Sequence, residues 1–149
     1  MAEVLIRAEL ASAGLAELVT VQSAGTGNWH LGGPMDRLAR AELASRGYDG
    51  ASHRARQITP EWLYRFDLLL AMDDANLANL EQMAADGSDV NGRLRLFRSF
   101  DADAPAGAQV PDPYGSGPGE FAVVFEMMRA AARGLVAELG KLLAERTGA

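Results

Sequence analysis

The sequence has no cysteine, two histidines and a single lysine, Lys141, among its 149 residues. A chain without cysteine forms no disulfide, no thiolate metal site and no thiol nucleophile. So few histidines leave little for a structural zinc, and we expect neither a metal nor another cofactor. No apolar run approaches the roughly 20 residues that a membrane span requires, and no signal peptide precedes the first expected helix. We therefore expect a cytoplasmic protein without a membrane partner.

Basic residues are also scarce relative to acidic ones. Lysine and arginine total 14 against 20 aspartates and glutamates, which gives a net charge of −6 and a pI near 4.9. Binding to nucleic acid needs lysine and arginine clustered on one face, so we expect no nucleic-acid partner. The length and the 48% share of hydrophobic residues suit one globular domain with a sizeable core. We expect that single domain to span residues 1–149.

Several segments have the apolar spacing of helices, with glycine or proline near their ends. Gly14 and Gly47 each follow such a segment, and glycine is common just past a helix end. Proline suits a first helical turn. The expected helices are residues 1–13, one that begins at Pro34 and is closed by Gly47, a short one from Thr59, one capped by Asp73 and Asp74, and a long amphipathic helix from Pro118 to about Arg146.

The long helix carries a stripe of large apolar side chains at helical spacing. Such a stripe serves either as core packing or as a ligand groove, and we favour core packing. The stripe consists of Phe121, Val124, Phe125, Met128, Leu135, Leu139 and Leu142.

Three shorter segments have the patterns of strands. Residues 19–23 form a short β-branched run that enters a glycine-rich turn. Residues 68–72 are a continuous apolar run bounded by acids, which is typical of a strand buried on both faces of a parallel sheet. Residues 94–96 alternate as in an edge strand. The order of helices and strands predicts an α/β fold in which helices flank a small parallel sheet.

Polar residues follow these strands, where parallel sheets bind ligands. In the first loop, Trp29 stands among glycines that permit unusual backbone dihedrals. It is expected either as one wall of an aromatic slot or as a lid folded onto the core. In a later loop, Asp112 lies between two prolines and beside Tyr114. This aspartate is expected either as a general acid beside a substrate wall or as a turn-capping residue.

Taken together in this order and spacing, a set of motifs resembles the low-molecular-weight protein tyrosine phosphatases across nearly the whole chain. The motifs are Ser23–Thr26, Gly27–His30, Ser52–Thr59, Ala71–Asp73 with Asn76 and Leu77, and Asp112–Tyr114.

The resemblance implies a four-stranded parallel sheet and hydrolysis of phosphotyrosine monoesters through a cysteinyl-phosphate. It implies Asp112 as the general acid and base, with Trp29 and Tyr114 as walls around the phenyl ring. Ser23 and His53 resemble residues that support the phosphate loop, whereas Asp73 is either part of that support or a helix cap. The implied partner is a phosphotyrosine-containing protein or a small aryl phosphate.

One part of the family pattern is missing. Family members begin with a strand and a Cys-x5-Arg-Ser phosphate loop, after which Met-Ala-Glu commonly follows, and this chain starts at Met1 with that tripeptide. We therefore expect the first central strand, the nucleophile and the loop to be absent, the chain to fold poorly alone, and the chain to be inactive. The open explanations are a start placed at an internal methionine, a non-catalytic phosphotyrosine-binding or regulatory protein, and a fragment that another chain completes.

The resemblance leaves the parent activity partly open. Thioredoxin-linked arsenate reductases share the architecture, but they also need cysteines, and the aromatic walls favour phosphotyrosine over arsenate. Phosphoarginine is harder to exclude, because the loop residue that helps to distinguish it is absent. Gly115 replaces a second tyrosine that often follows Tyr114 in the family, which widens the expected slot.

Overall fold

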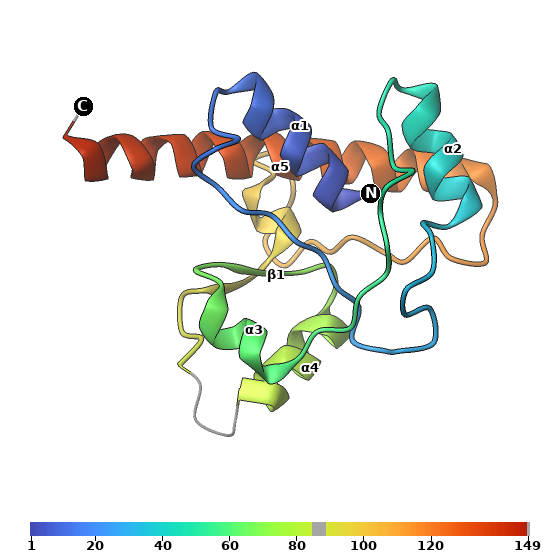
Figure 1. Ribbon diagram of the computed structural model, residues 1–149, viewed down its shortest axis with the longest axis horizontal. Coiled ribbons are helices and arrows are strands. Elements are labelled where there is room, and N and C mark those ends of the chain that lie inside the picture. Colours follow the sequence, from blue (N-terminus) through green and yellow to red (C-terminus); the bar gives the residue numbers. More distant parts are fainter. Residues whose placement is uncertain (85–88, 149) are drawn as a thin grey trace.

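The structure is a computed structural model that describes residues 1–84 and 89–148 (Figure 1). Its elements, in chain order, are α1 (Ala2–Ser12), α2 (Arg37–Ser45), α3 (Pro60–Arg65), β1 (Leu69–Ala71), α4 (Asp74–Ala84), β2 (Leu94–Leu96), the 3-10 helix η1 (Phe97–Phe100) and α5 (Pro118–Thr147).

The sheet lies between two layers of helices. β1 and β2 pair in parallel, with Leu70 opposite Arg95. Successive strand side chains point to opposite faces, so Leu69 and Ala71 enter the core formed with α3 and α4, whereas Leu70 packs against the core of α1, α2 and α5. Figure 1 shows this arrangement, with α3 and α4 on one side of β1 and α1, α2 and α5 on the other. The predicted α/β fold with a small parallel sheet is confirmed.

The larger core forms along α5, as the apolar stripe predicts. Phe121, Val124, Phe125, Met128 and Leu135 are all buried there, and Leu139 packs against the same cluster. Leu142 is 49% exposed, so the prediction that it packs in the core is wrong. The last turns of α5 extend beyond α1 in Figure 1.

The helix ends follow local backbone chemistry, with one correction. Gly14 and Gly47 have φ of +72° and +83°, which suits glycine just past a helix. The second helix does not begin at Pro34. It begins at Arg37, because the Asp36 side chain accepts hydrogen bonds from the backbone N–H groups of residues 38 and 39. Pro34 instead forms an isolated bridge with Arg54.

The expected strand over residues 19–23 is not formed, and the sheet of the described residues has two strands rather than the four that the resemblance implies. A strand forms when its backbone groups pair with those of a neighbouring strand. Here side chains of α1 make hydrogen bonds with this backbone instead. The Arg7 guanidinium donates to the Val21 carbonyl at 2.5 Å, and the Ser23 N–H donates to the Glu3 carboxylate at 3.0 Å. Just after this segment, Gly25 forms an isolated parallel bridge with Gln57.

Candidate functional site

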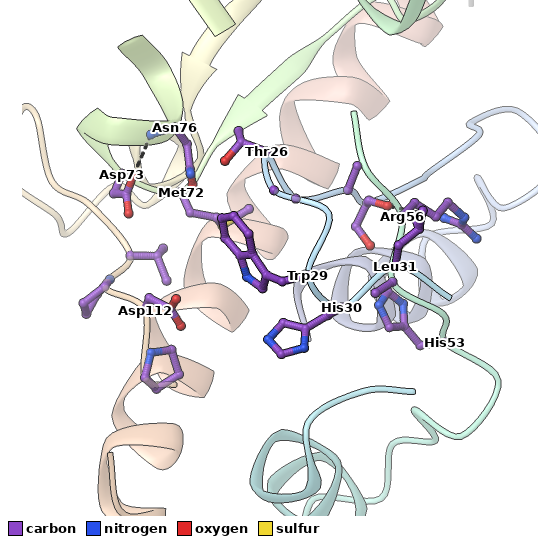
Figure 2. Close-up of a pocket in the computed structure, with 18 of the residues that line it drawn as sticks. Thr26, Trp29, His30, Leu31, His53, Arg56, Met72, Asp73, Asn76 and Asp112 are labelled. Carbon is purple, nitrogen blue, oxygen red and sulfur yellow. Dashed lines mark hydrogen bonds between the residues drawn. The ribbon is translucent and has the colours of Figure 1, made fainter. Parts of the chain in front are cut away.

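A cavity of about 480 Å³ opens at the carboxyl end of β1. It brings together five residues that the sequence pointed to from separate loops: Ser23, Trp29, His53, Asp73 and Asp112. Figure 2 labels four of them, Trp29, His53, Asp73 and Asp112, and shows the indole of Trp29 between Asp112 and His53. Met72, Val110 and Met128 add apolar surface, so Met128 belongs both to the core and to the pocket.

Trp29 is not a lid on the core. Its side chain is 78% exposed, and its ring lies against the backbone of Gly27. A Cβ atom at position 27 would stand 2.1 Å from the ring, so this close approach requires glycine. The structure therefore has the aromatic side chain at the pocket, as the slot interpretation requires.

Tyr114 lies at the rim rather than in the lining. Its side chain is 63% exposed, and its ring centroid is 5.5 Å from that of His30, which does line the pocket. His30 and Leu31 were not singled out as site residues from the sequence, although both are exposed and line the pocket. Their only sequence signal is their place beside Trp29 in the glycine-rich loop.

Asp112 makes the turn-capping contact and also lies at the pocket. Its Oδ1 accepts a hydrogen bond from the Tyr114 N–H at 3.0 Å, which is the turn-capping contact. The same residue is exposed and lines the pocket. A carboxyl group held this way by a local turn can exchange a proton with a bound ligand.

Asp73 is a helix cap that also reaches the pocket. Its Oδ1 accepts a hydrogen bond from the Asn76 N–H at 2.8 Å in the first turn of α4 (Figure 2). The loop that carries Asp112 is anchored nearby, because the Val110 N–H donates to the Met72 carbonyl at 2.7 Å. The carboxyl end of β1 thus positions both the start of α4 and the loop that carries Asp112.

Glu3 is a residue that sequence reasoning missed. It is buried, with 9% of its surface exposed, and its Oε2 accepts hydrogen bonds from the Ser23 hydroxyl at 2.5 Å and the Ser23 N–H at 3.0 Å. The same oxygen lies 3.7 Å from Nδ1 of His53 and 3.6 Å from the Arg56 guanidinium. The available signal was the Met-Ala-Glu tripeptide, in which an acid occupies the first turn of an amphipathic helix.

Burial and charge act in opposite directions at this cluster. Burial is the largest effect on Glu3 and raises its pKa, but hydrogen bonds from Ser23 and Arg7 and the charges of Arg7 and Arg56 outweigh it, so the pKa lies below its ordinary value. Burial also lowers the pKa of His53, and the nearby amino group of Met1 lowers it further. The pKa of that amino group is itself lowered, chiefly by burial.

The arrangement supplies an acid, aromatic surface and an imidazole around one pocket, but no thiol, because the sequence has no cysteine. Among the described residues, no helix is both long and apolar enough to cross a membrane.

Comparison with known proteins gives one consistent family. The model of the low molecular weight phosphotyrosine protein phosphatase family matches residues 1–145. A low molecular weight protein-tyrosine-phosphatase of Streptomyces coelicolor is 43% identical over 138 residues, which cover 92% of this chain and 83% of that protein. Low molecular weight protein-tyrosine phosphatase A of Mycobacterium bovis is 38% identical over 136 residues, or 91% of this chain and 80% of its own length.

The fold agrees with this sequence similarity. The crystal structure of a protein tyrosine phosphatase from Entamoeba histolytica superposes with a TM-score of 0.86 at 26% identity, over 94% of this chain and 87% of that one.

Proposed function

The chain belongs to the low molecular weight phosphotyrosine protein phosphatase family, and from this we propose that its pocket receives the phosphorylated ring of a phosphotyrosine. The observation that carries the proposal is the gathering of Trp29 and Asp112 on one pocket of about 480 Å³. An aromatic side chain and a carboxyl group are what an aryl phosphate needs on the side of its leaving group.

When a thiolate attacks the phosphorus, as in the family's reaction, Asp112 protonates the tyrosyl oxygen that leaves, and in the second step it activates the water that releases phosphate. The 149 residues supply this acid and not the thiolate. Trp29 and Tyr114 contact the phenyl ring of the bound group. Ser23 and His53 support the phosphate-binding side of the pocket, and Asp73 anchors the start of α4 beside it.

The nucleophile is the part that the 149 residues do not supply. Hydrolysis of a phosphate monoester is very slow without catalysis, and this family uses a thiolate that the sequence lacks. We therefore propose that the 149-residue chain binds the aryl group of a phosphotyrosine but does not hydrolyse the phosphate ester.

A second function, a phosphotyrosine-binding or regulatory protein without catalysis, is favoured by the same combination. The pocket and its aromatic rim are present in a chain that has no cysteine. In that case binding alone is the activity, and the substrate protein is held rather than dephosphorylated.

The direct test is binding and hydrolysis by the purified 149-residue chain. We expect no release of p-nitrophenol from p-nitrophenyl phosphate. We also expect O-phosphotyrosine to change the Trp29 emission in a Trp62→Phe background, which leaves Trp29 as the only indole. Tyr114→Ala should weaken binding about 2- to 10-fold, the value of one aromatic contact.

Tyr64→Ala is the matched control, because Tyr64 is 67% exposed but lies on α3 and does not line the pocket. Measurable hydrolysis by the chain would contradict the proposed inactivity, and absence of binding would contradict the phosphotyrosine pocket. Joining a strand and a Cys-x5-Arg-Ser loop ahead of Met1 separates the two functions. Hydrolysis by that fusion, reduced about 10²- to 10⁴-fold by Asp112→Asn, supports the phosphatase, whereas binding without hydrolysis supports the non-catalytic protein.

A further inference from the structure

A second hollow, here called the α4 hollow, lies beside the first pocket and has a volume of about 470 Å³. Its lining comes from the glycine-rich loop and from α4, and consists of Thr26, Gly27, Trp29, Asn79, Gln82 and Met83. The three loop residues of this set also line the first pocket. The Trp29 side chain therefore faces both spaces, and a ligand that contacts it in the first pocket lies next to the α4 hollow.

The helix side of the two spaces is continuous as well. Asn76 lines the first pocket, and Asn79 lines the α4 hollow three positions later on the same helix. Residues three apart are neighbours on one face of a helix. Figure 2 shows the two walls where this groove begins, with Asn76 on α4 and Thr26 on the loop. One groove thus leads out of the pocket along α4.

The lining of the α4 hollow carries no charged side chain. Asn79 and Gln82 end in primary amides, each of which offers hydrogen-bond donors and an acceptor. Both residues are exposed, and neither side-chain amide has a hydrogen-bond partner among the described residues. Such a lining attracts no ion. It suits a neutral group that donates and accepts hydrogen bonds at once, as the backbone of a peptide does.

The spacing of the two amides also fits an extended peptide. Side chains at positions i and i+3 of a helix have Cβ atoms about 5–6 Å apart. An extended chain rises about 3.3 Å per residue, so the backbone groups on one of its edges recur about every 6–7 Å. Two flexible amides at the helical spacing can therefore reach successive groups on one edge. A small aryl phosphate has no such backbone to place there.

We propose that the α4 hollow is a subsite for the peptide backbone that flanks the phosphotyrosine of a protein ligand. The amides of Asn79 and Gln82 hydrogen-bond this backbone, and Met83 and Trp29 provide apolar surface beneath it. The subsite rests on the proposed function, because the phosphotyrosine in the first pocket brings the flanking residues to α4. Its effect is to select a phosphotyrosine-containing protein over a small aryl phosphate.

The test compares two ligands of the purified 149-residue chain, with Trp29 emission followed in a Trp62→Phe background. One is the N-acetyl amide of O-phosphotyrosine, and the other is a short alanine peptide with a central phosphotyrosine and blocked ends. The two have the same charge, and the peptide adds backbone with almost no side chain. We expect the peptide to bind about 3- to 30-fold more tightly, the value of two neutral hydrogen bonds.

The double variant Asn79→Ala, Gln82→Ala should bring the ratio of the two affinities close to one. Alanine is favourable in a helix, so α4 should remain folded. The matched control is Asn91→Ala, because Asn91 is also an exposed amide but lines neither space. It should leave the ratio unchanged. An equal fall in Asn91→Ala would show a general effect and would overturn the subsite.

The remaining outcomes separate the subsite from the proposed function. If the small ligand binds and the peptide binds no more tightly, or if the folded double variant keeps the ratio, the subsite alone is overturned. If neither ligand binds, the proposed function fails, and the subsite with it. If the double variant does not fold, NMR of the unmodified chain decides. The side-chain amide signals of Asn79 and Gln82 should then shift with the peptide and not with the small ligand, and their failure to shift overturns the subsite.

Discussion

Two glycines of one loop show how sharply a single residue shapes the pocket. At Gly27 an added Cβ would meet three ring atoms of Trp29 at 2.1–2.4 Å. At Gly25 the nearest atom would be 3.9 Å away. The indole is 78% exposed, so few other contacts hold it. The position of the Trp29 ring therefore depends on residue 27 being glycine, which has no side chain.

Gly27→Ala should displace the Trp29 ring with little loss of stability, because an exposed side chain can swing away. We expect a changed Trp29 emission and near-UV circular dichroism in a Trp62→Phe background, with the free energy of unfolding altered by less than about 1 kcal/mol. Gly25→Ala should leave the emission as it is. Identical spectra for Gly27→Ala and the parent chain would show that the ring does not lie on Gly27.

At the scale of elements, α5 and η1 approach each other closely at a glycine. A Cβ at Gly134 of α5 would lie 1.7 Å from the Phe100 carbonyl oxygen, a backbone atom that has no freedom to swing aside. Arg95 of β2 reinforces the same junction, since its guanidinium lies 3.9 Å from the Phe100 ring centroid and 2.8 Å from Glu138 of α5. Glycine in a helix interior costs stability, and here it permits the packing of two elements.

Gly134→Ala should destabilise the chain by about 1–3 kcal/mol, because α5 and η1 must separate to admit the methyl group. Gly140→Ala, also within α5, should stabilise it by about 0.5–1 kcal/mol, since its Cβ would meet only Leu15 at 3.7 Å. Urea unfolding of both variants checks the pair. A neutral Gly134→Ala would mean that the two elements do not approach as closely as described.

At the scale of the whole molecule, the cluster around Glu3 couples folding to pH. The pKa of His53 is lowered in the folded chain, so below its ordinary value of about 6.5 the unfolded chain binds the proton more readily. The stability from the neutral imidazole is therefore present above about pH 6.5 and is lost as the pH falls through the folded pKa. The lowered pKa of the Met1 amino group acts in the same direction at higher pH.

We expect the free energy of unfolding, measured with urea, to decrease from pH 7.5 to pH 5.5. His53→Gln should flatten this slope. Glu3 adds a second loss at lower pH, because its pKa is below the ordinary 4.5 and its contribution disappears as the carboxylate is protonated. A slope that His53→Gln does not alter would assign the pH dependence to other groups.

Local chemistry made much of the fold predictable. The apolar run at 68–72 became β1, the Asp73 cap opened α4, and the stripe of α5 became the core, because period and capping act over a few residues. The helix expected from Pro34 began at Arg37 instead, since the Asp36 cap outweighed the proline signal. Glu3 could not be found this way, because its partners Ser23 and His53 lie 20 and 50 positions along the chain.

The sequence by itself determined the family, the α/β order of elements and the absence of a thiol, because motifs, periodicity and composition are properties of the chain alone. Only the tertiary structure decided that residues 19–23 join α1 through side chains rather than a strand ladder, and that Trp29 stands exposed at the pocket. It also decided that one buried carboxylate faces Ser23, His53 and Arg56 together. Such contacts join segments far apart in the chain, and their distances exist only once packing has brought those segments together.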